Sequence, residues 1–153
     1  MAQLPFTNIG ESHELAEDVR ALFDELATSL SHDQRAYSGE CHPVLDVYET
    51  DEAIEIIMDV SGVPADAIRI LFRTGVVLIA GEKAPAPTSP EQTFHLVERE
   101  FGRFARAVRV NGAFDVASAR ATLRDGELIV ELPKMTDRRG TAHRVPVRTD
   151  RPA

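Results

Sequence analysis

Residues 119–132 read ARATLRDGELIVEL, with apolar side chains at every second position on both sides of the Asp125-Gly126 pair. These apolar positions are Ala119, Ala121 and Leu123 before the pair and Leu128, Val130 and Leu132 after it. A period of two is typical of a strand that buries one face. An Asp-Gly pair tolerates the positive φ angles that a tight hairpin turn needs. We therefore predict two antiparallel strands joined at this pair.

The same period recurs across residues 43–135, where we expect about eight short strands. Residues 54–60 place Ile54, Ile56, Met58 and Val60 on one face. Residues 68–73 and 76–81 are joined at Thr74-Gly75, a second hairpin signal. The other expected strands are Val44–Glu49, Phe94–Glu100 and Phe104–Val110. Many short strands with no helical pattern between them predict an all-β fold, an immunoglobulin-like antiparallel β-sandwich.

The composition limits the possible partners and locations. The chain has 153 residues, 43% of them apolar, which suits one domain with a core. Its net charge of −8 argues against nucleic acid or a membrane as the main partner. The longest apolar runs, such as Val76–Ala80, are much shorter than the roughly 20 residues that span a bilayer. Residues 1–10 lack the pattern of a secretory signal, and the single cysteine, Cys41, favours a reducing environment. We expect a cytoplasmic protein.

Residues 1–42 are acidic and contain one segment with helical periodicity. Its apolar stripe, called here the helix stripe, consists of Leu15, Val19, Leu22, Phe23, Leu26 and Leu30. Ser12 is the expected N-cap of this helix. Two interpretations are open: a surface helix that packs on its own domain, or an apolar arm that contacts other chains.

A proline-rich segment interrupts the strands at residues 83–93, which contain Pro85, Pro87 and Pro90. Prolines make a stiff, extended chain that forms few strand hydrogen bonds. A long connection of this kind is uncommon in a sandwich and is often functional or mobile. It is either a surface loop or an arm that carries the strand around Phe94–Val97 to another subunit.

Residues 136–153 form a polar tail with five arginines and two aspartates. Its only large apolar side chains are Val145 and Val147, on either side of Pro146. Residues two apart in an extended chain point the same way. We therefore predict that Val145–Val147 acts as a stiff apolar plug, and the chain divides into an arm (1–42), a sandwich (43–135) and a tail (136–153).

Several short motifs follow one another along the chain: Pro43–Glu49, Asp59–Pro64, Ile79–Lys83, Phe94–Phe104, Arg106–Arg109, Ala121–Leu128, Leu132–Lys134 and Val145–Val147. In this order they resemble the small heat-shock proteins, the α-crystallin-domain chaperones, in their bacterial and plant branch. The chain departs from the family pattern at Glu127, where Val is usual, and at Asn111, where Pro is usual. Its plug has two valines where isoleucines are also found, which removes about 0.8 kcal/mol of burial per missing CH₂.

The resemblance implies an ATP-independent chaperone that holds partly unfolded client proteins, forms homodimers and assembles them into larger homo-oligomers. By resemblance, the dimer interface contains Phe94, His95, Leu96, Val97 and Arg109; the less favoured alternative for Arg109 is an ordinary surface arginine. The plug is expected in a groove of another dimer, between Ile68, Ile70 and Phe72 on one wall and Ala119, Ala121 and Leu123 on the other. The helix stripe is the expected client-binding surface.

The sequence contains no pattern that favours catalysis. It has no phosphate-binding glycine loop and no Gly-x-Ser-x-Gly element, so we expect neither a cofactor nor an enzyme. The five histidines lack metal-ligand spacing. Cys41 and His42 are neighbours, and side chains of neighbouring residues point apart in an extended chain. The alternative function is a co-chaperone-like adaptor, a β-sandwich that binds one folded partner.

Overall fold

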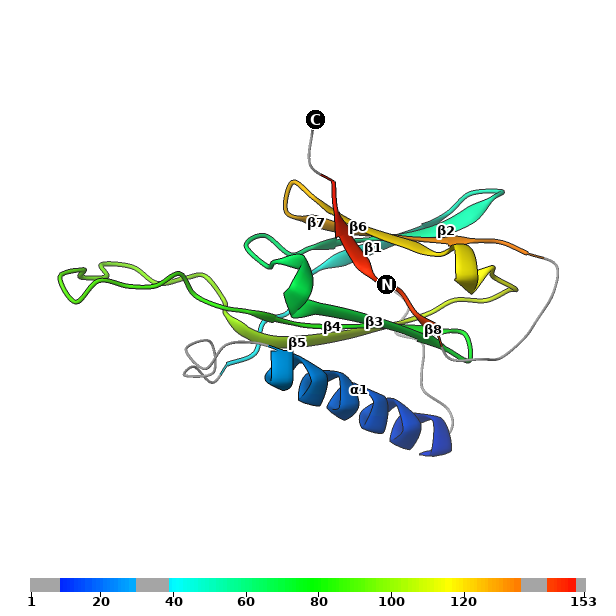
Figure 1. The fold of residues 1–153 in the computed structure, drawn as a ribbon, viewed down its shortest axis with the longest axis horizontal. Coiled ribbons are helices and arrows are strands. Elements are labelled where there is room, and N and C mark those ends of the chain that lie inside the picture. The colour runs from blue at the N-terminus through cyan, green and yellow to red at the C-terminus, as the bar shows by residue number, and fades with distance from the viewer. Residues whose placement is uncertain (1–8, 30–38, 136–142, 151–153) are drawn as a thin grey trace.

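The computed structural model describes residues 9–29, 39–135 and 143–150, which form a two-layered β-sandwich with a long helix on its outside (Figure 1). One layer is a five-stranded sheet in the order β1-β2-β7-β6-β9, and the other is a four-stranded sheet in the order β5-β4-β3-β8. The elements in chain order are α1 Ile9–Ser29, β1 Leu45–Glu49, β2 Ala53–Asp59, β3 Ile68–Arg73, β4 Val76–Lys83, β5 Gly102–Arg109, β6 Arg120–Arg124, β7 Glu127–Pro133, β8 His143–Arg144 and β9 Val147–Thr149. The predicted β-sandwich is confirmed.

Both predicted hairpin turns contain residues with positive φ. The φ angles of Thr74 and Gly75 are 48° and 75°, and those of Asp125 and Gly126 are 51° and 84°. Two successive residues of positive φ give a turn whose twist matches that of the flanking strands. The turns join β3 to β4 and β6 to β7 in antiparallel pairs.

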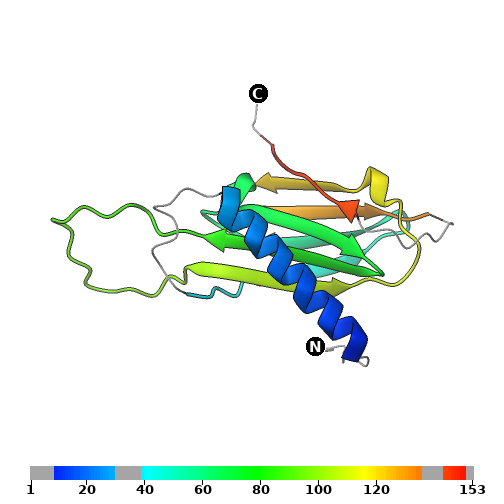
Figure 2. The same ribbon diagram turned by 60° about the horizontal axis from the view of Figure 1, so that its bottom comes forward.

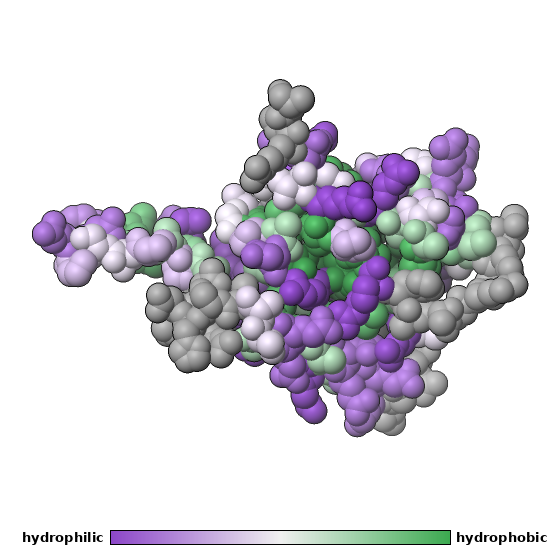
Figure 3. Space-filling model, viewed as in Figure 1, coloured by the Kyte–Doolittle hydropathy of each residue, from purple (hydrophilic) through white to green (hydrophobic). Residues whose placement is uncertain are grey.

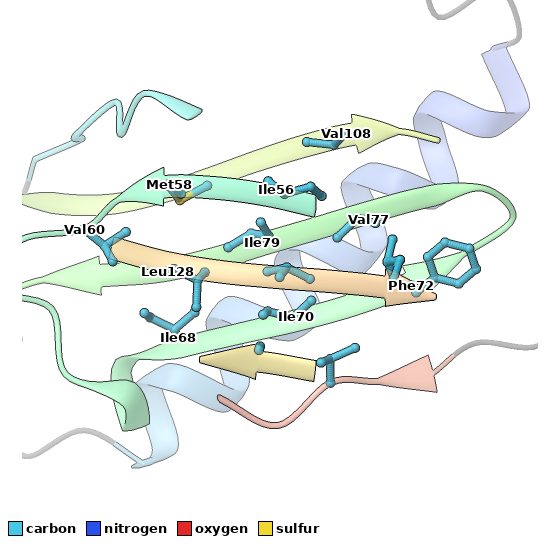
Figure 4. Close-up of a cluster of buried hydrophobic side chains, with 14 of the residues drawn as sticks. Ile56, Met58, Val60, Ile68, Ile70, Phe72, Val77, Ile79, Val108 and Leu128 are labelled. Carbon is cyan, nitrogen blue, oxygen red and sulfur yellow. The ribbon is translucent and has the colours of Figure 1, made fainter. Parts of the chain in front are cut away.

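The core lies between the two layers and is built from the inward-facing side chains of alternate strand positions (Figure 4). Ile56, Met58 and Leu128 of the five-stranded sheet have an exposed fraction of 0%. Ile70 and Ile79 face them from the four-stranded sheet. Each aliphatic side chain buried in this way contributes about 1.5–3 kcal/mol, so these two inner faces hold the layers together.

Helix α1 lies across the outer face of the four-stranded sheet (Figure 2). Leu22 is fully buried and packs against Leu71, Leu78 and Ala80 of β3 and β4. Leu26 is also fully buried. The four-stranded sheet is therefore covered on both faces, by the core and by the helix.

Three local expectations differ from the structure. Ser12 lies inside α1, which includes residues from Ile9 onward, so the N-cap prediction is wrong. Residues 94–100 form no strand, and none of the strands within the described ranges pairs with them. The tail adds β8 and β9, and β9 runs parallel to β6 within an otherwise antiparallel sheet.

Candidate functional site

The tail occupies an open edge of the sandwich, between β3 of one sheet and β6 of the other. Val145 is 5% exposed and belongs to the core cluster, and its backbone N–H donates to the carbonyl oxygen of Ile70 at 3.2 Å. Val147 is half-buried and lies opposite Ala121 in the parallel pairing of β9 with β6. Pro146 separates the two short strands, so the tail crosses from one sheet to the other. Figure 3 shows hydrophobic surface between the layers on the side that the tail crosses.

The structure thus places the plug residues beside the predicted groove residues. Ile68, Ile70, Phe72 and Ala121 are buried in the same cluster as Val145. Ala119 and Leu123 are partly buried and pack against this cluster. The plug lies in the groove of its own chain. Binding of the plug to another dimer stays a prediction.

The proline-rich connection between β4 and β5 projects away from the sandwich as a long loop (Figures 1 and 2). Three of its apolar side chains are largely exposed: Phe94 by 66%, Leu96 by 73% and Val97 by 68%. His95 is exposed as well. At the loop's base, the Arg99 guanidinium lies 5.0 Å from the centre of the Phe101 ring. Such a cluster of apolar side chains on an unpaired segment is typical of a surface that another chain covers.

Strand β1 is a second element with a free side, and the sequence did not indicate this. Among the described strands it pairs with β2 alone, so it forms one edge of the five-stranded sheet. Val44, Val47 and Tyr48 are exposed by 65%, 45% and 43%. The Tyr48 hydroxyl donates to Glu55 Oε2, and this bond raises the pKa of the tyrosine. Edge strands with exposed apolar residues readily pair with other strands. The sequence shows that this segment contains apolar residues. It does not show that they are exposed, because their exposure depends on the position of β1 at the edge of the sheet.

Within one copy of the protein, Arg109 lies at the end of β5 that is remote from the projecting loop. It is the last residue of β5 and faces Val76 beside the β3–β4 turn, whereas the loop enters β5 at Gly102. Together with Glu14, Asp18 and Arg73 it lines a small hollow of about 40 Å³ under α1. The structure therefore does not bring Arg109 together with Phe94–Val97 in one chain, and its place in a dimer interface stays a prediction.

The helix stripe faces the sheet. Leu15, Val19 and Phe23 are partly buried and pack with Leu22 against β3 and β4. Leu30 lies outside the described residues. Ion pairs flank the stripe: Asp18 Oδ1 lies 3.2 Å from Arg73 Nη1, and Glu25 bonds to Arg144 of the tail. Of the two interpretations of this segment, the structure shows the helix packed on its own domain, so client binding by the stripe requires that the helix leave the sheet.

Cys41 is a buried residue of the hydrophobic core. It is 6% exposed, and its backbone N–H donates to the carbonyl oxygen of Arg103 at 3.1 Å. Burial raises the pKa of its thiol, which disfavours the reactive thiolate. The backbone N–H of His42 donates to Glu100 Oε2 at 3.2 Å. Within the described ranges, no group of three or more histidine, cysteine and acidic residues is arranged to hold a metal ion.

In the described part of the chain, no helix is long and apolar enough to cross a membrane. A β-sandwich with a long loop between β4 and β5, and with an apolar Val-Pro-Val segment in the edge groove, defines a class of protein built from α-crystallin-type domains. The Hsp20/alpha crystallin family matches residues 46–148, and the chain belongs to this family.

Individual relatives agree with the family assignment. The chain is 30% identical over 102 residues to the 22.0 kDa heat shock protein of Arabidopsis thaliana, a match that covers 66% of this chain and 52% of the plant protein. The chain thus spans about half the length of that relative. Heat shock protein 16.0 from Schizosaccharomyces pombe has a similar structure, with a TM-score of 0.60, 26% identity, and coverage of 67% of this chain and 98% of that chain.

A second solved structure also resembles this chain. The small heat-shock protein from Xylella fastidiosa gives a TM-score of 0.56 at 25% identity, over 66% of this chain and 95% of that chain. That protein is described as having a distinct high order structure. The recognition of the family from the ordered motifs of the sequence is therefore confirmed.

Proposed function

We propose that this protein is an ATP-independent chaperone that binds partly unfolded proteins and prevents their aggregation under stress. Membership in the Hsp20/alpha crystallin family supports a chaperone role in general terms. The observation that carries the finer proposal is the plug: Val145 fills a core position, yet it lies on a tail at an open edge of the sandwich. A side chain in that position can be exchanged for the same residue of another chain without unfolding the sandwich.

The dimer forms by strand exchange in this proposal. The loop segment Phe94–Val97 of one copy adds to β1 of the second copy, where exposed Val47 and Tyr48 receive it. Two observations support this pairing: the loop's apolar residues have no partner strand in the described part of their own chain, and β1 has one free edge. Strand addition to a sheet edge takes its affinity from main-chain hydrogen bonds and its specificity from alternate side chains.

Larger assemblies form when the plug of one dimer occupies the groove of another. The groove walls and the plug are the same in both arrangements, so the bound contacts are the same whether the tail is the chain's own or a neighbour's. The two arrangements differ in the entropy of closing the chain and in the protein concentration. Assembly in solution therefore depends on concentration.

The client surface in this proposal is the helix stripe. Its residues are held on the sheet in the closed chain, and release of α1 exposes both the stripe and the sheet residues Leu71, Leu78 and Ala80. Apolar burial is non-directional, so such a surface accepts many unfolding proteins. The buried single cysteine is compatible with the reducing cytoplasm, where we propose that the protein acts.

Two measurements test the proposal. Light scattering gives the size of the oligomer, and an aggregation assay without ATP measures how well the protein protects a heat-denatured client. We expect oligomers larger than a dimer and suppression of client aggregation. Deletion of residues 1–38 should reduce protection while circular dichroism shows an intact sandwich; the cut precedes Gly39 because Cys41 is part of the core. Greater protection after this deletion would assign client binding to the uncovered sheet face. A monomeric full chain that protects no client contradicts the proposal and favours an adaptor with one folded partner.

A further inference from the structure

The carboxylate of Glu25 on helix α1 bonds directly to Arg144 of the tail, and Asp18 of the same helix adds a weaker electrostatic attraction to this arginine. Arg144 Nη1 donates to Glu25 Oε2 at 2.8 Å, and Arg144 Nη2 donates to Glu25 Oε1 at 2.6 Å. Paired bonds of this kind between guanidinium and carboxylate are strong and fix the relative orientation of the two groups. The bond from Arg144 lowers the pKa of the Glu25 carboxyl. Two segments separated by 119 positions in the chain are thereby held together.

The position of Arg144 depends on the position of the plug. Arg144 directly precedes Val145, and neighbouring side chains of an extended chain point to opposite faces. Val145 enters the core, while Arg144 pairs in register with Leu71, whose side chain contacts the helix. Two consecutive tail residues thus bind the two faces of the four-stranded sheet, one in the core and one at the helix.

The position of a second arginine near Glu25, Arg69, does not depend on the tail. Arg69 Nη1 donates to the carbonyl oxygens of Asp66 and Ile68 at 2.7 and 3.0 Å, so its guanidinium is held by the backbone at the start of β3. Its Nη2 donates to Ser29 Oγ at 3.1 Å, and its Nε lies 3.8 Å from Glu25 Oε2. When Arg144 leaves, Glu25 therefore keeps only the longer contact with Arg69 among the contacts described.

We propose that the bound plug locks helix α1 on the sheet through the Glu25–Arg144 pair, so that plug release and helix release are coupled. The inference rests on the proposed function, because it takes the plug as the assembly element and the helix stripe as the client element. Any tail that fills the groove, the chain's own or that of a second copy, brings Arg144 to the same place. Exchange of tails between copies therefore loosens the client-binding helix of the chain whose groove becomes empty.

The coupling is reciprocal, because a coupling free energy between two sites acts equally in both directions. A helix that stays on the sheet retains the plug, and a helix that leaves favours its release. Ion pairs that are partly exposed change an equilibrium by about two- to fivefold. We expect a coupling of this size.

Hydrogen exchange measured by mass spectrometry on the full chain tests the lock from both sides. Glu25→Gln should speed amide exchange in the tail, residues 143–149, by about two- to fivefold. The matched control is Asp24→Asn, which removes the same charge from the preceding, exposed residue of α1, and it should leave tail exchange unchanged. In the other direction, Val145→Ala should speed exchange in residues 15–29, whereas Thr149→Ala on the exposed end of the tail should not.

Arg144→Gln tests the same pair from the tail and keeps the proposal testable if one variant perturbs the fold. Exchange in β7 reports on the sandwich and should be the same in all variants. The double variant Glu25→Gln/Arg144→Gln should exchange no faster than the faster single variant, because both remove one interaction. Wild-type tail exchange in Glu25→Gln, or purely additive effects in the double variant, would overturn the lock. Failure of the proposed function shows separately, as a wild-type chain that does not assemble or protect clients.

Discussion

Replacing the plug valines should dissociate the assembly, and the structure sets the size of the effect. Val145→Ala removes two buried carbons, a loss of about 1.5 kcal/mol at 0.8 kcal/mol per buried CH₂. Val147 is half-buried, so its truncation adds roughly half as much. The sum of about 2 kcal/mol weakens plug binding on the order of thirtyfold, since each 1.4 kcal/mol is a factor of ten.

The assay is size-exclusion chromatography with light scattering over a series of protein concentrations. We expect the double variant Val145→Ala/Val147→Ala to form dimers where the wild type forms larger species, and to need about thirtyfold more protein to reassemble. Thr149→Ala is the matched control, because this tail residue is exposed and pairs with Leu123 through its backbone. A double variant with the same mass as the wild type at every concentration would refute the role of the groove in assembly.

Three further predictions follow from the loop, the core and the helix. In the double plug variant, deletion of residues 91–97 should convert dimers to monomers in light scattering, while His95→Ser should not; persistent dimers would place the interface elsewhere. Gly81→Ala should lower the free energy of unfolding by about 1–3 kcal/mol, because its Cβ would contact the Phe104 ring and lie 2.8 Å from the Ala67 carbonyl oxygen; an unchanged melting temperature contradicts this packing. The Glu25 pKa is lowered from about 4.5 by Arg144, so its contribution to stability is present above that pH and lost as pH falls through the lowered value. Glu25→Gln should therefore flatten the acid-side decrease in melting temperature relative to Asp24→Asn, and parallel curves would exclude this contribution.

Part of the sandwich could be predicted because strands such as β2 and β7 have one buried and one more exposed face. In the β6–β7 hairpin alternation gives the strands, and in both hairpins the residues that adopt positive φ give the turns. β3 begins and ends at the residues expected from the sequence. Local patterns of this kind are sufficient wherever the partner strand is close in the chain.

Residues 94–100 show where local pattern fails. Their composition is compatible with a strand, yet strand structure also needs a neighbour with free backbone groups. The described chain supplies none at that place, and its three exposed apolar residues remain in a loop. A sequence pattern cannot distinguish a strand that pairs within the chain from one that requires a second copy.

The helix and the tail illustrate a second limit. The helix stripe predicts an apolar face, but the identity of the covering surface is set by the sandwich. β8 and β9 have two and three residues, too few for a period to be recognised. The pair Glu25 and Arg144 joins these elements across 119 positions, and no local signal indicates it. The groove residues could be named because the ordered motifs resemble a known family, which carries information about distant contacts.

The distribution of buried contacts implies an order of opening. The tail is held by one buried valine, one half-buried valine, the pairing of two short strands and the Glu25–Arg144 pair. The sandwich is held by a core cluster that draws on every strand from β2 to β7. Local segments with few buried contacts open at a lower free energy than the whole domain. The tail therefore opens first, and the helix loses its bidentate partner while the sandwich is intact, so apolar surface becomes available on a scaffold that is still folded and able to close again.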